Sequence, residues 1–193
     1  MELFSRIDHV SLAVNEYDKA RAFFEDVFQV IPGAGGKGPP WDFRWQVFSL
    51  GDLTRLEIIS PNGGGEFLKK FLSEREGGVH HITLETPDIR KVKEHLDGKG
   101  VPYFGYSEAI EEWKELFIHP KDAYGVLIQI AEFKPEDWLS DAVNFPREGP
   151  RWSVEAGSGG VDLSISHPGG GKAAIRLSKD EVRDLIRDLE KVI

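Results

Sequence analysis

The sequence predicts an α+β fold in which paired βαβββ modules form a curved, cup-like mixed sheet with helices outside. The first observation is that the order strand, helix, then three strands occurs twice within residues 5–133. The second is that one offset of 72 residues relates His9 to His81 and Glu57 to Gln129. The third is that residues 134–193 follow a different pattern, which predicts a small C-terminal appendage of strands ending in a helix.

The first module is expected over about residues 5–61. Alternating β-branched and polar residues predict its strands, and apolar residues at helical spacing predict its helix. The expected elements are a strand at 7–14, a helix at 16–28, a poorly defined strand at 29–31, and strands at 41–50 and 53–60. The stretch PGAGGKGPP at 32–40 is typical of turns. A short helix at 66–76 should then connect the two modules.

The second module is expected over about residues 78–133, and the appendage over 134–193. The module should contain a strand at 79–86, a helix at 88–100, and strands at 101–106, 114–120 and 125–133. The appendage should contain an irregular stretch at 134–150 anchored by Trp138 and Leu139, strands at 151–155, 161–166 and 173–177, and a final helix. Ser178 and Glu181 have the spacing of a capping box at the start of that helix.

Composition narrows the classes of function. The chain of 193 residues has no cysteine, which excludes disulfides, thiolate metal ligands and a cysteine nucleophile. Its net charge of −9 argues against broad binding to a nucleic-acid backbone. No apolar run approaches the roughly 18 residues that a membrane span needs, and the first residues lack an apolar leader. We therefore expect a cytoplasmic protein without nucleic-acid or membrane partners.

Four polar residues stand inside predicted strands at equivalent places of the two modules: His9, Glu57, His81 and Gln129. Strand alternation directs each away from its apolar neighbours, so all four can project from one face of the sheet. Two imidazoles, one carboxylate and one amide oxygen can bind one divalent ion and leave positions for water or substrate. Each residue by itself would more often be an ordinary hydrogen-bonded strand residue, but the symmetric set favours a metal site for Zn, Mn, Co, Ni or Fe.

Three strings carry a resemblance to a known family: IDHVSLAV at 7–14, GGVHHITLE at 77–85 and HPKDAYGVLIQI at 119–130. They resemble the vicinal oxygen chelate superfamily, which includes glyoxalase I, bleomycin-resistance proteins and extradiol dioxygenases. Within it, the chain is most similar to the methylmalonyl-CoA epimerases. The resemblance implies a homodimer and a small carbonyl substrate, with an acyl-CoA among the candidates. It also implies that metal ligands fall on His9, Glu57, His81 and the position of Gln129.

The sequence departs from the epimerase pattern in three places. The last ligand is usually Glu in that family, whereas Gln129 can still offer an oxygen but cannot take a proton. A Gly-Ala-x-Gly hairpin is replaced by EAIEEWK at 108–114, and the tail from Lys134 has no counterpart. Glu57 is therefore the expected catalytic carboxylate, and we expect weak methylmalonyl-CoA epimerase activity unless another base has taken over.

Three functions remain open at this level. The leading interpretation is a metal-dependent isomerase or lyase of the epimerase or glyoxalase I type, which moves a proton next to a metal-chelated carbonyl. The second is a non-catalytic small-molecule-binding protein of the bleomycin-resistance type, which the missing carboxylate at Gln129 favours. The third is an Fe(II) dioxygenase, although such proteins usually carry a Glu at the position of Gln129.

Overall fold

The structure, a computed structural model, describes residues 3–38, 42–50, 54–134, 150–166 and 172–193. Its internal contacts divide the chain into two compact units. The first unit contains β1 (Arg6–Val14), α1 (Tyr17–Phe28), β2 (Ile31–Gly36), β3 (Phe43–Ser49), β4 (Arg55–Pro61), α2 (Glu66–Leu72), β5 (Gly77–Glu85), α3 (Ile89–Lys99), β6 (Phe104–Ile110), β7 (Trp113–Ile118), a 3₁₀ turn (Pro120–Asp122) and β8 (Leu127–Glu132). The second contains β9 (Trp152–Gly157), β10 (Gly160–Ser166), β11 (Lys172–Leu177) and α4 (Lys179–Glu190).

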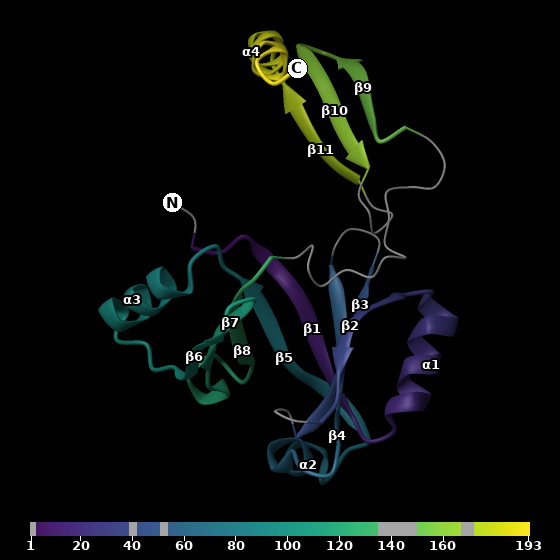
Figure 1. Cartoon of the computed structure of the whole chain (residues 1–193), viewed down its shortest axis with the longest axis vertical. Coiled ribbons are helices and arrows are strands. Elements are labelled where there is room, and N and C mark those ends of the chain that lie inside the picture. Colours follow the sequence, from purple (N-terminus) through teal and green to yellow (C-terminus); the bar gives the residue numbers. More distant parts are fainter. Residues whose placement is uncertain (1–2, 39–41, 51–53, 135–149, 167–171) are drawn as a thin grey trace. The chain divides into compact units, whose positions relative to one another are not determined.

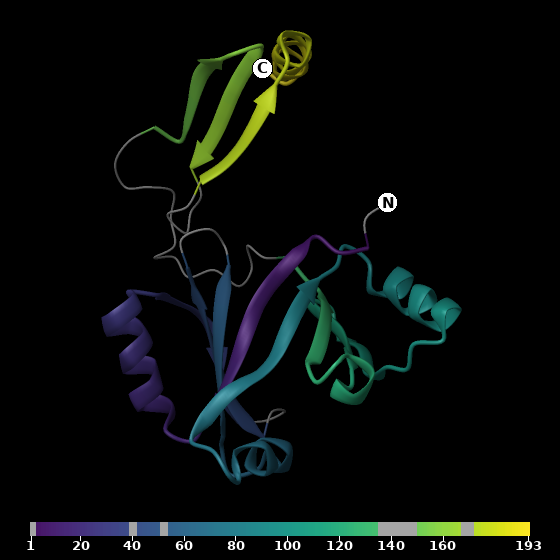
Figure 2. The same cartoon turned by 180° about the vertical axis from the view of Figure 1, so that it is seen from behind.

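The strands of the first unit form one curved sheet in the order β2-β3-β4-β1-β5-β8-β7-β6 (Figures 1 and 2). β1 runs parallel to β4, and β5 runs parallel to β8. The two halves join where β1 pairs antiparallel with β5. Both halves therefore repeat the same strand order outward from the centre, which confirms the predicted pair of βαβββ modules in a mixed sheet.

The two longer helices of this unit cover the outer face of the sheet, on its opposite flanks (Figure 1). α1 packs on β4 over the fully buried Ile58. α3 packs on β7 and β8 over the buried Leu116 and Ile130. Because side chains alternate along a strand, Glu57 and Gln129 face away from these helices. The helices thus fix which face of the sheet becomes the inside of the cup.

The short helix α2 packs against the other face. Its buried Leu68 and Leu72 contact Ala13 at the end of β1 and Ile59 on β4. Ala13 lies four residues after His9, so strand alternation places it on the face of the predicted ligands. α2 therefore closes one end of the cup, next to the candidate site.

The second strand of the first module differs from its expected position. The strand expected at 29–31 is β2, which continues into the stretch that we expected to be turns. The side-chain amide of Gln46 on β3 donates to the carbonyl oxygens of Gly33 and Ala34, at 2.6 and 3.1 Å. A Cβ atom on Gly35 would lie 2.7 Å from that same side chain. Glycine is needed here because two strands approach closely, and the composition alone resembles a turn.

The central strand pair contains two bulges that alternation does not predict. One register shift leaves Asp8 on β1 without a partner residue on β5, and the other leaves His80 on β5 without a partner on β1. The offset that relates His9 to His81 also relates Asp8 to His80. A β-bulge re-aims the side chains around it. Each predicted histidine ligand is therefore preceded by a residue whose direction the bulge has changed.

The second unit is an antiparallel sheet in the order β11-β10-β9, with α4 packed against β10 and β11. Ser178 and Glu181 form the predicted capping box at the start of α4. The irregular stretch expected at 134–150, including Trp138 and Leu139, lies almost entirely outside the described residues. Within the described parts of the chain, no helix is both long and apolar enough to cross a lipid bilayer.

Candidate metal centre

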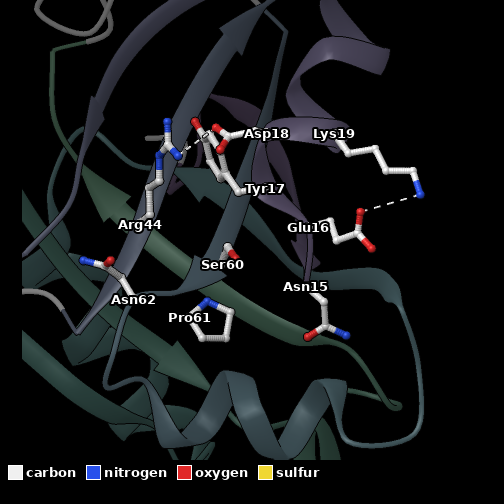
Figure 3. A pocket seen from close by; sticks show the side chains of 9 residues that line it. All are labelled: Asn15, Glu16, Tyr17, Asp18, Lys19, Arg44, Ser60, Pro61 and Asn62. Atoms are coloured by element: carbon white, nitrogen blue, oxygen red, sulfur yellow. Dashed lines mark hydrogen bonds and ion pairs between the residues drawn. The ribbon is translucent and has the colours of Figure 1, made fainter.

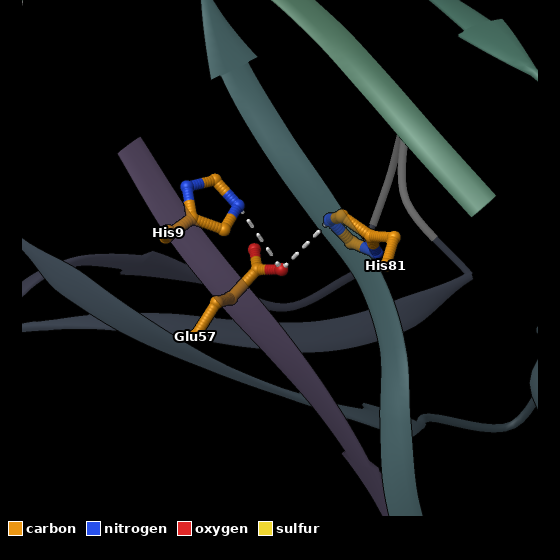
Figure 4. Close-up of side chains that lie close together, drawn as sticks. All are labelled: His9, Glu57 and His81. Atoms are coloured by element: carbon orange, nitrogen blue, oxygen red, sulfur yellow. Dashed lines mark ion pairs between the residues drawn. The ribbon is translucent and has the colours of Figure 1, made fainter. Parts of the chain in front are cut away.

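His9, Glu57 and His81 converge inside the cup from the three central strands (Figure 4). Glu57 Oε2 lies 3.7 Å from Nε2 of His9 and 3.5 Å from Nε2 of His81. One potential ligand atom from each residue lies within 4.8 Å of the other two. The convergence follows from topology, because β1 lies between its parallel partner β4 and its antiparallel partner β5. Three of the four predicted ligands thus surround one point.

The polar atoms around this point are buried but incompletely satisfied. Glu57 is 9% exposed and His81 is 7% exposed. Within the described part of the chain, Oε2 of Glu57, Nε2 of His81 and Oγ of the fully buried Ser11 have no hydrogen-bond partner. Each such group costs about 1–3 kcal/mol when it is left unsatisfied. A divalent cation would supply the missing partner for the carboxylate and the imidazole, so these donors fit a metal ion.

Burial shifts the protonation of both groups. Desolvation raises the pKa of Glu57 above its usual value, and the neighbouring His9 opposes this rise. Desolvation also lowers the pKa of His81 well below the ordinary histidine value, and the charges of His9 and His80 add to this effect. His81 is therefore held neutral, which is the form that binds a metal. Without a cation, the same burial disfavours the ionised form of Glu57.

Gln129, the fourth predicted ligand, lies in the same part of the cup and is 8% exposed. Its Oε1 accepts a hydrogen bond from Thr83 at 2.5 Å, and its Nε2 donates to Glu115 at 2.7 Å. The nearby side chain of Gln129 partly opposes the lowering of the pKa of His81. The amide is therefore next to the His–Glu–His group but engaged on both sides. Metal ligation by Gln129 remains a prediction.

Asp8 holds His9 from the side opposite Glu57. It is fully buried, and its carboxylate accepts a 2.7 Å hydrogen bond from Nδ1 of His9. Arg55, also buried, donates to Asp8 from Nε at 3.0 Å and from Nη2 at 2.8 and 2.7 Å. Burial alone would raise the pKa of Asp8, but His9 and Arg55 outweigh it and lower the pKa. An ionised carboxylate on Nδ1 leaves Nε2 of His9 for a metal.

Thr83 contacts the other nitrogen of His9. Its hydroxyl oxygen lies 2.8 Å from Nε2 of His9, and Thr83 is fully buried. A metal ion on Nε2 would have to replace this contact. Because Thr83 also donates to Gln129, it links the first module's histidine to the second module's amide.

Four residues of the centre were missed by the sequence analysis: Asp8, Arg55, Thr83 and Glu115. Thr83 and Glu115 each carry a signal, since alternation places Thr83 on the face of His81 and Glu115 opposite Leu116. Alternation directs Asp8 away from His9, and only the bulge brings both to one side. Arg55 shares the face of Glu57, but its bond to Asp8 depends on that same bulge.

A separate surface hollow of about 430 Å³ lies at the start of α1 (Figure 3). The guanidinium of Arg44 stacks over the ring of Tyr17, 3.5 Å from its centroid, and pairs with Asp18 at 2.9 Å. The lining residues include none of the predicted metal ligands. This hollow is therefore not the candidate metal centre.

Fold and centre together define a class: a protein of paired βαβββ modules whose cup holds a buried His–Glu–His group able to bind a divalent ion. The sequence profile of the glyoxalase/bleomycin resistance protein/dioxygenase superfamily matches residues 8–117. The match covers more than half of the chain and includes His9, Glu57 and His81. The chain belongs to this superfamily.

Individual relatives are methylmalonyl-CoA epimerases. The chain is 28% identical to an ethylmalonyl-CoA/methylmalonyl-CoA epimerase of Cereibacter sphaeroides, over 67% of this chain and 99% of that protein. The crystal structure of methylmalonyl-CoA epimerase from Mycobacterium tuberculosis has a TM-score of 0.62 at 25% identity, over 70% of this chain and 93% of that one. A Streptomyces coelicolor methylmalonyl-CoA epimerase in complex with 2-nitronate-propionyl-CoA has a TM-score of 0.61 at 23% identity, over 67% and 98%. About a third of this chain lies outside these matches.

The buried pair of Asp8 and Arg55 leads to a stability prediction. Asp8→Asn should lower the free energy of unfolding by about 3–5 kcal/mol, because Arg55 would stay buried without a compensating charge. Denaturant unfolding of the metal-free protein measures this loss. Asp18→Asn is the matched control, since Asp18 pairs with Arg44 at the surface with 86% of its side chain exposed. Its cost should not exceed about 1 kcal/mol. Equal losses for the two variants would contradict the assignment.

Proposed function

We propose that the protein is a metal-dependent isomerase that moves a proton at the carbon next to a carbonyl group. The observation that carries this proposal is the buried His9–Glu57–His81 group, whose Glu57 and His81 present unsatisfied atoms to a common point. Membership of the superfamily and the epimerase relatives support the same reaction class. A lyase of the glyoxalase I type needs the same proton transfer and is part of the proposal.

The ion would be held by His9, Glu57 and His81. Gln129 would become a fourth ligand once the hydrogen bond from Thr83 to its Oε1 atom is broken. Zn, Mn, Co, Ni and Fe(II) all suit this nitrogen and oxygen donor set. When bound, the ion would polarise a carbonyl oxygen and so acidify the adjacent C–H bond. Asp8 supports the site by fixing His9 with Nε2 directed inward.

Glu57 would take the proton. Burial raises the pKa of Glu57 in the absence of an ion, and a bound cation would oppose this rise, so the carboxylate would be ionised and ready to accept a proton. The C–H bond breaks, its electron pair passes into the carbonyl group, and the proton goes to a carboxylate oxygen of Glu57. Return of a proton to the same face regenerates the substrate, whereas inversion needs a donor on the opposite face.

Glu115 is our candidate for that second donor. It lies on β7, accepts hydrogen bonds from Gln129 and from Trp113 Nε1, at 2.7 and 2.9 Å, and is partly buried. Its charge contributes to the raised pKa of Glu57, so the two carboxylates are near enough to interact. Glu115 would thus supply the carboxylate that a Glu at position 129 supplies in the epimerase pattern.

We propose an acyl-CoA with an acidic α-proton as the substrate, and methylmalonyl-CoA as the first compound to test. The support is that the relatives are epimerases of such thioesters and that one of them is solved with an acyl-CoA analogue. A non-catalytic binding protein is the second candidate. It is favoured by one observation, namely that Gln129 cannot take a proton and that its amide is held by Thr83 and Glu115.

Metal content tests the centre directly. Protein purified without chelator should hold about one divalent ion per chain, and His81→Ala should abolish stoichiometric binding. Affinity should fall on acidification, because protons compete for the imidazoles and because Glu57, with its raised pKa, protonates at a higher pH than usual. Isothermal titration with Zn and Co measures both effects. His95→Ala, at an exposed position of α3, is the control. Unchanged affinity in His81→Ala would remove this ligand assignment.

Deuterium exchange separates the two proposed carboxylates. In D₂O, Glu57→Gln should lower exchange of the α-proton of methylmalonyl-CoA by about 10²–10⁴-fold, because the base is lost. Glu115→Gln should keep exchange but lose inversion, which chiral analysis of the product detects. Glu112→Gln, exposed on the same hairpin, should change neither.

Three outcomes would contradict parts of this proposal. Inversion that is unimpaired in Glu115→Gln would remove Glu115 from its role. If Gln129→Glu alone gains inversion, the absence of a carboxylate at position 129, and not Glu115, determines whether the protein epimerises its substrate. If the parent binds an acyl-CoA in the cup yet exchanges no proton with any enolisable carbonyl compound, the binding-protein function replaces the isomerase.

We also propose a homodimer, as the resemblance implies. Phe23, Val27 and Phe28 on α1 are exposed by 51%, 58% and 56%, and such apolar surface is commonly covered by a partner. Analytical ultracentrifugation should give twice the chain mass of 21.7 kDa. Phe23→Lys should shift the equilibrium toward the monomer, whereas a parent that is monomeric at every concentration would contradict the proposal.

A further inference from the structure

We propose that His80 is a positioning residue that holds His81 with its Nε2 atom directed at a divalent cation. This role rests on the proposed metal centre and goes beyond it, because His80 would bind neither the ion nor the substrate. Its Nδ1 atom lies 2.9 Å from Nδ1 of His81, at hydrogen-bond distance. The two rings are nearly perpendicular, at 81°, with centroids 5.2 Å apart.

The internal repeat gives this contact a counterpart. Asp8 and His80 occupy equivalent positions of the two modules, and each lies at a bulge of the central strand pair. Each contacts Nδ1 of the histidine that follows it, Asp8 at 2.7 Å and His80 at 2.9 Å. The two modules therefore support their histidines by the same backbone device, with a carboxylate in one and an imidazole in the other.

The proposed metal centre decides which of the two histidines donates in this contact. Of two facing Nδ1 atoms, one must carry the hydrogen and the other must accept it. Nε2 of His81 is the buried atom that has no partner among the described residues, and it lies 3.5 Å from the Glu57 carboxylate. A histidine that binds a metal through Nε2 carries its hydrogen on Nδ1. His81 is therefore the donor, and Nδ1 of His80 is the acceptor.

α2 holds the ring of His80 in place. The centroids of Phe67 and Phe71 lie 5.6 and 5.1 Å from that of His80, and the Phe71 ring meets it edge-on at 77°. Leu68 and Leu72 anchor α2 in the core, and Phe71 packs against the same cluster, so the helix holds its aromatic residues next to His80. α2 therefore contacts His80 through its aromatic rings, and His80 in turn contacts His81.

Nitrogen-15 NMR of the metal-free parent tests the tautomer without any substitution. Long-range correlation spectra of protein with labelled histidine should show the hydrogen of His81 on Nδ1 and that of His80 on Nε2. A hydrogen on Nε2 of His81, or on Nδ1 of His80, would overturn the proposal.

Two substitutions at His80 test the consequence for metal binding. His80→Asn keeps an acceptor oxygen near the place of Nδ1, whereas His80→Phe keeps an aromatic ring against Phe67 and Phe71 but removes the acceptor. Loss of such a support typically lowers metal affinity by about 10–100-fold. We expect this loss of Zn and Co affinity in His80→Phe, together with a changed visible spectrum of bound Co. His80→Asn should stay within about threefold of the parent, as should His95→Asn on the exposed face of α3.

The outcomes separate this inference from the proposed function. If the parent binds Zn and Co but His80→Phe binds them equally well with an unchanged Co spectrum, only the role of His80 fails. If His80→Asn loses as much affinity as His80→Phe while both unfold at the parent's temperature, hydrogen-bond acceptance is not the reason and the inference fails. If the parent binds neither metal, the metal centre and the role of His80 fail together.

Discussion

The antiparallel pairing of β1 with β5 is the constraint on which the rest of the structure depends. It joins the two modules, and it places His9 and His81 on neighbouring strands at the centre of the sheet. The parallel pairing of β4 with β1 then brings Glu57 to the same place. A change in this register by one residue would turn the ligands to the other face. The candidate centre is therefore a consequence of how the two modules are joined.

The junction of β1 and β5 buries polar groups, which destabilises the fold unless each group has a partner. The fully buried Asp8 is tolerated because His9 and Arg55 satisfy its carboxylate. Two of the buried atoms that have no hydrogen-bond partner among the described residues, Oε2 of Glu57 and Nε2 of His81, face the point where the side chains of His9, Glu57 and His81 converge. A protein that buries charge gains little stability from it, so such a network is better explained by function than by folding. Metal binding would satisfy these atoms.

The two modules have diverged at matching positions while keeping the same frame. Glu57 corresponds to Gln129, and Asp8 corresponds to His80. In each pair one module has a carboxylate and the other a neutral group. The second module still has a carboxylate in the cup, because Gln129 donates a hydrogen bond to Glu115 on β7. Equivalent positions of the two modules therefore carry side chains of different chemistry, although the backbone repeats.

The sequence by itself determined the two modules, the position of their helices and the three converging side chains of His9, Glu57 and His81, because alternation and an internal offset depend only on local spacing. It also indicated Gln129 as a member of the set, which the structure places beside His81. Only the tertiary structure decided that β2 runs through the glycine-rich stretch, and that Asp8 and His80 turn toward the histidines. Both depend on how one strand meets another. A bulge is a mismatch between two strands, and neither strand alone carries the information that would reveal it.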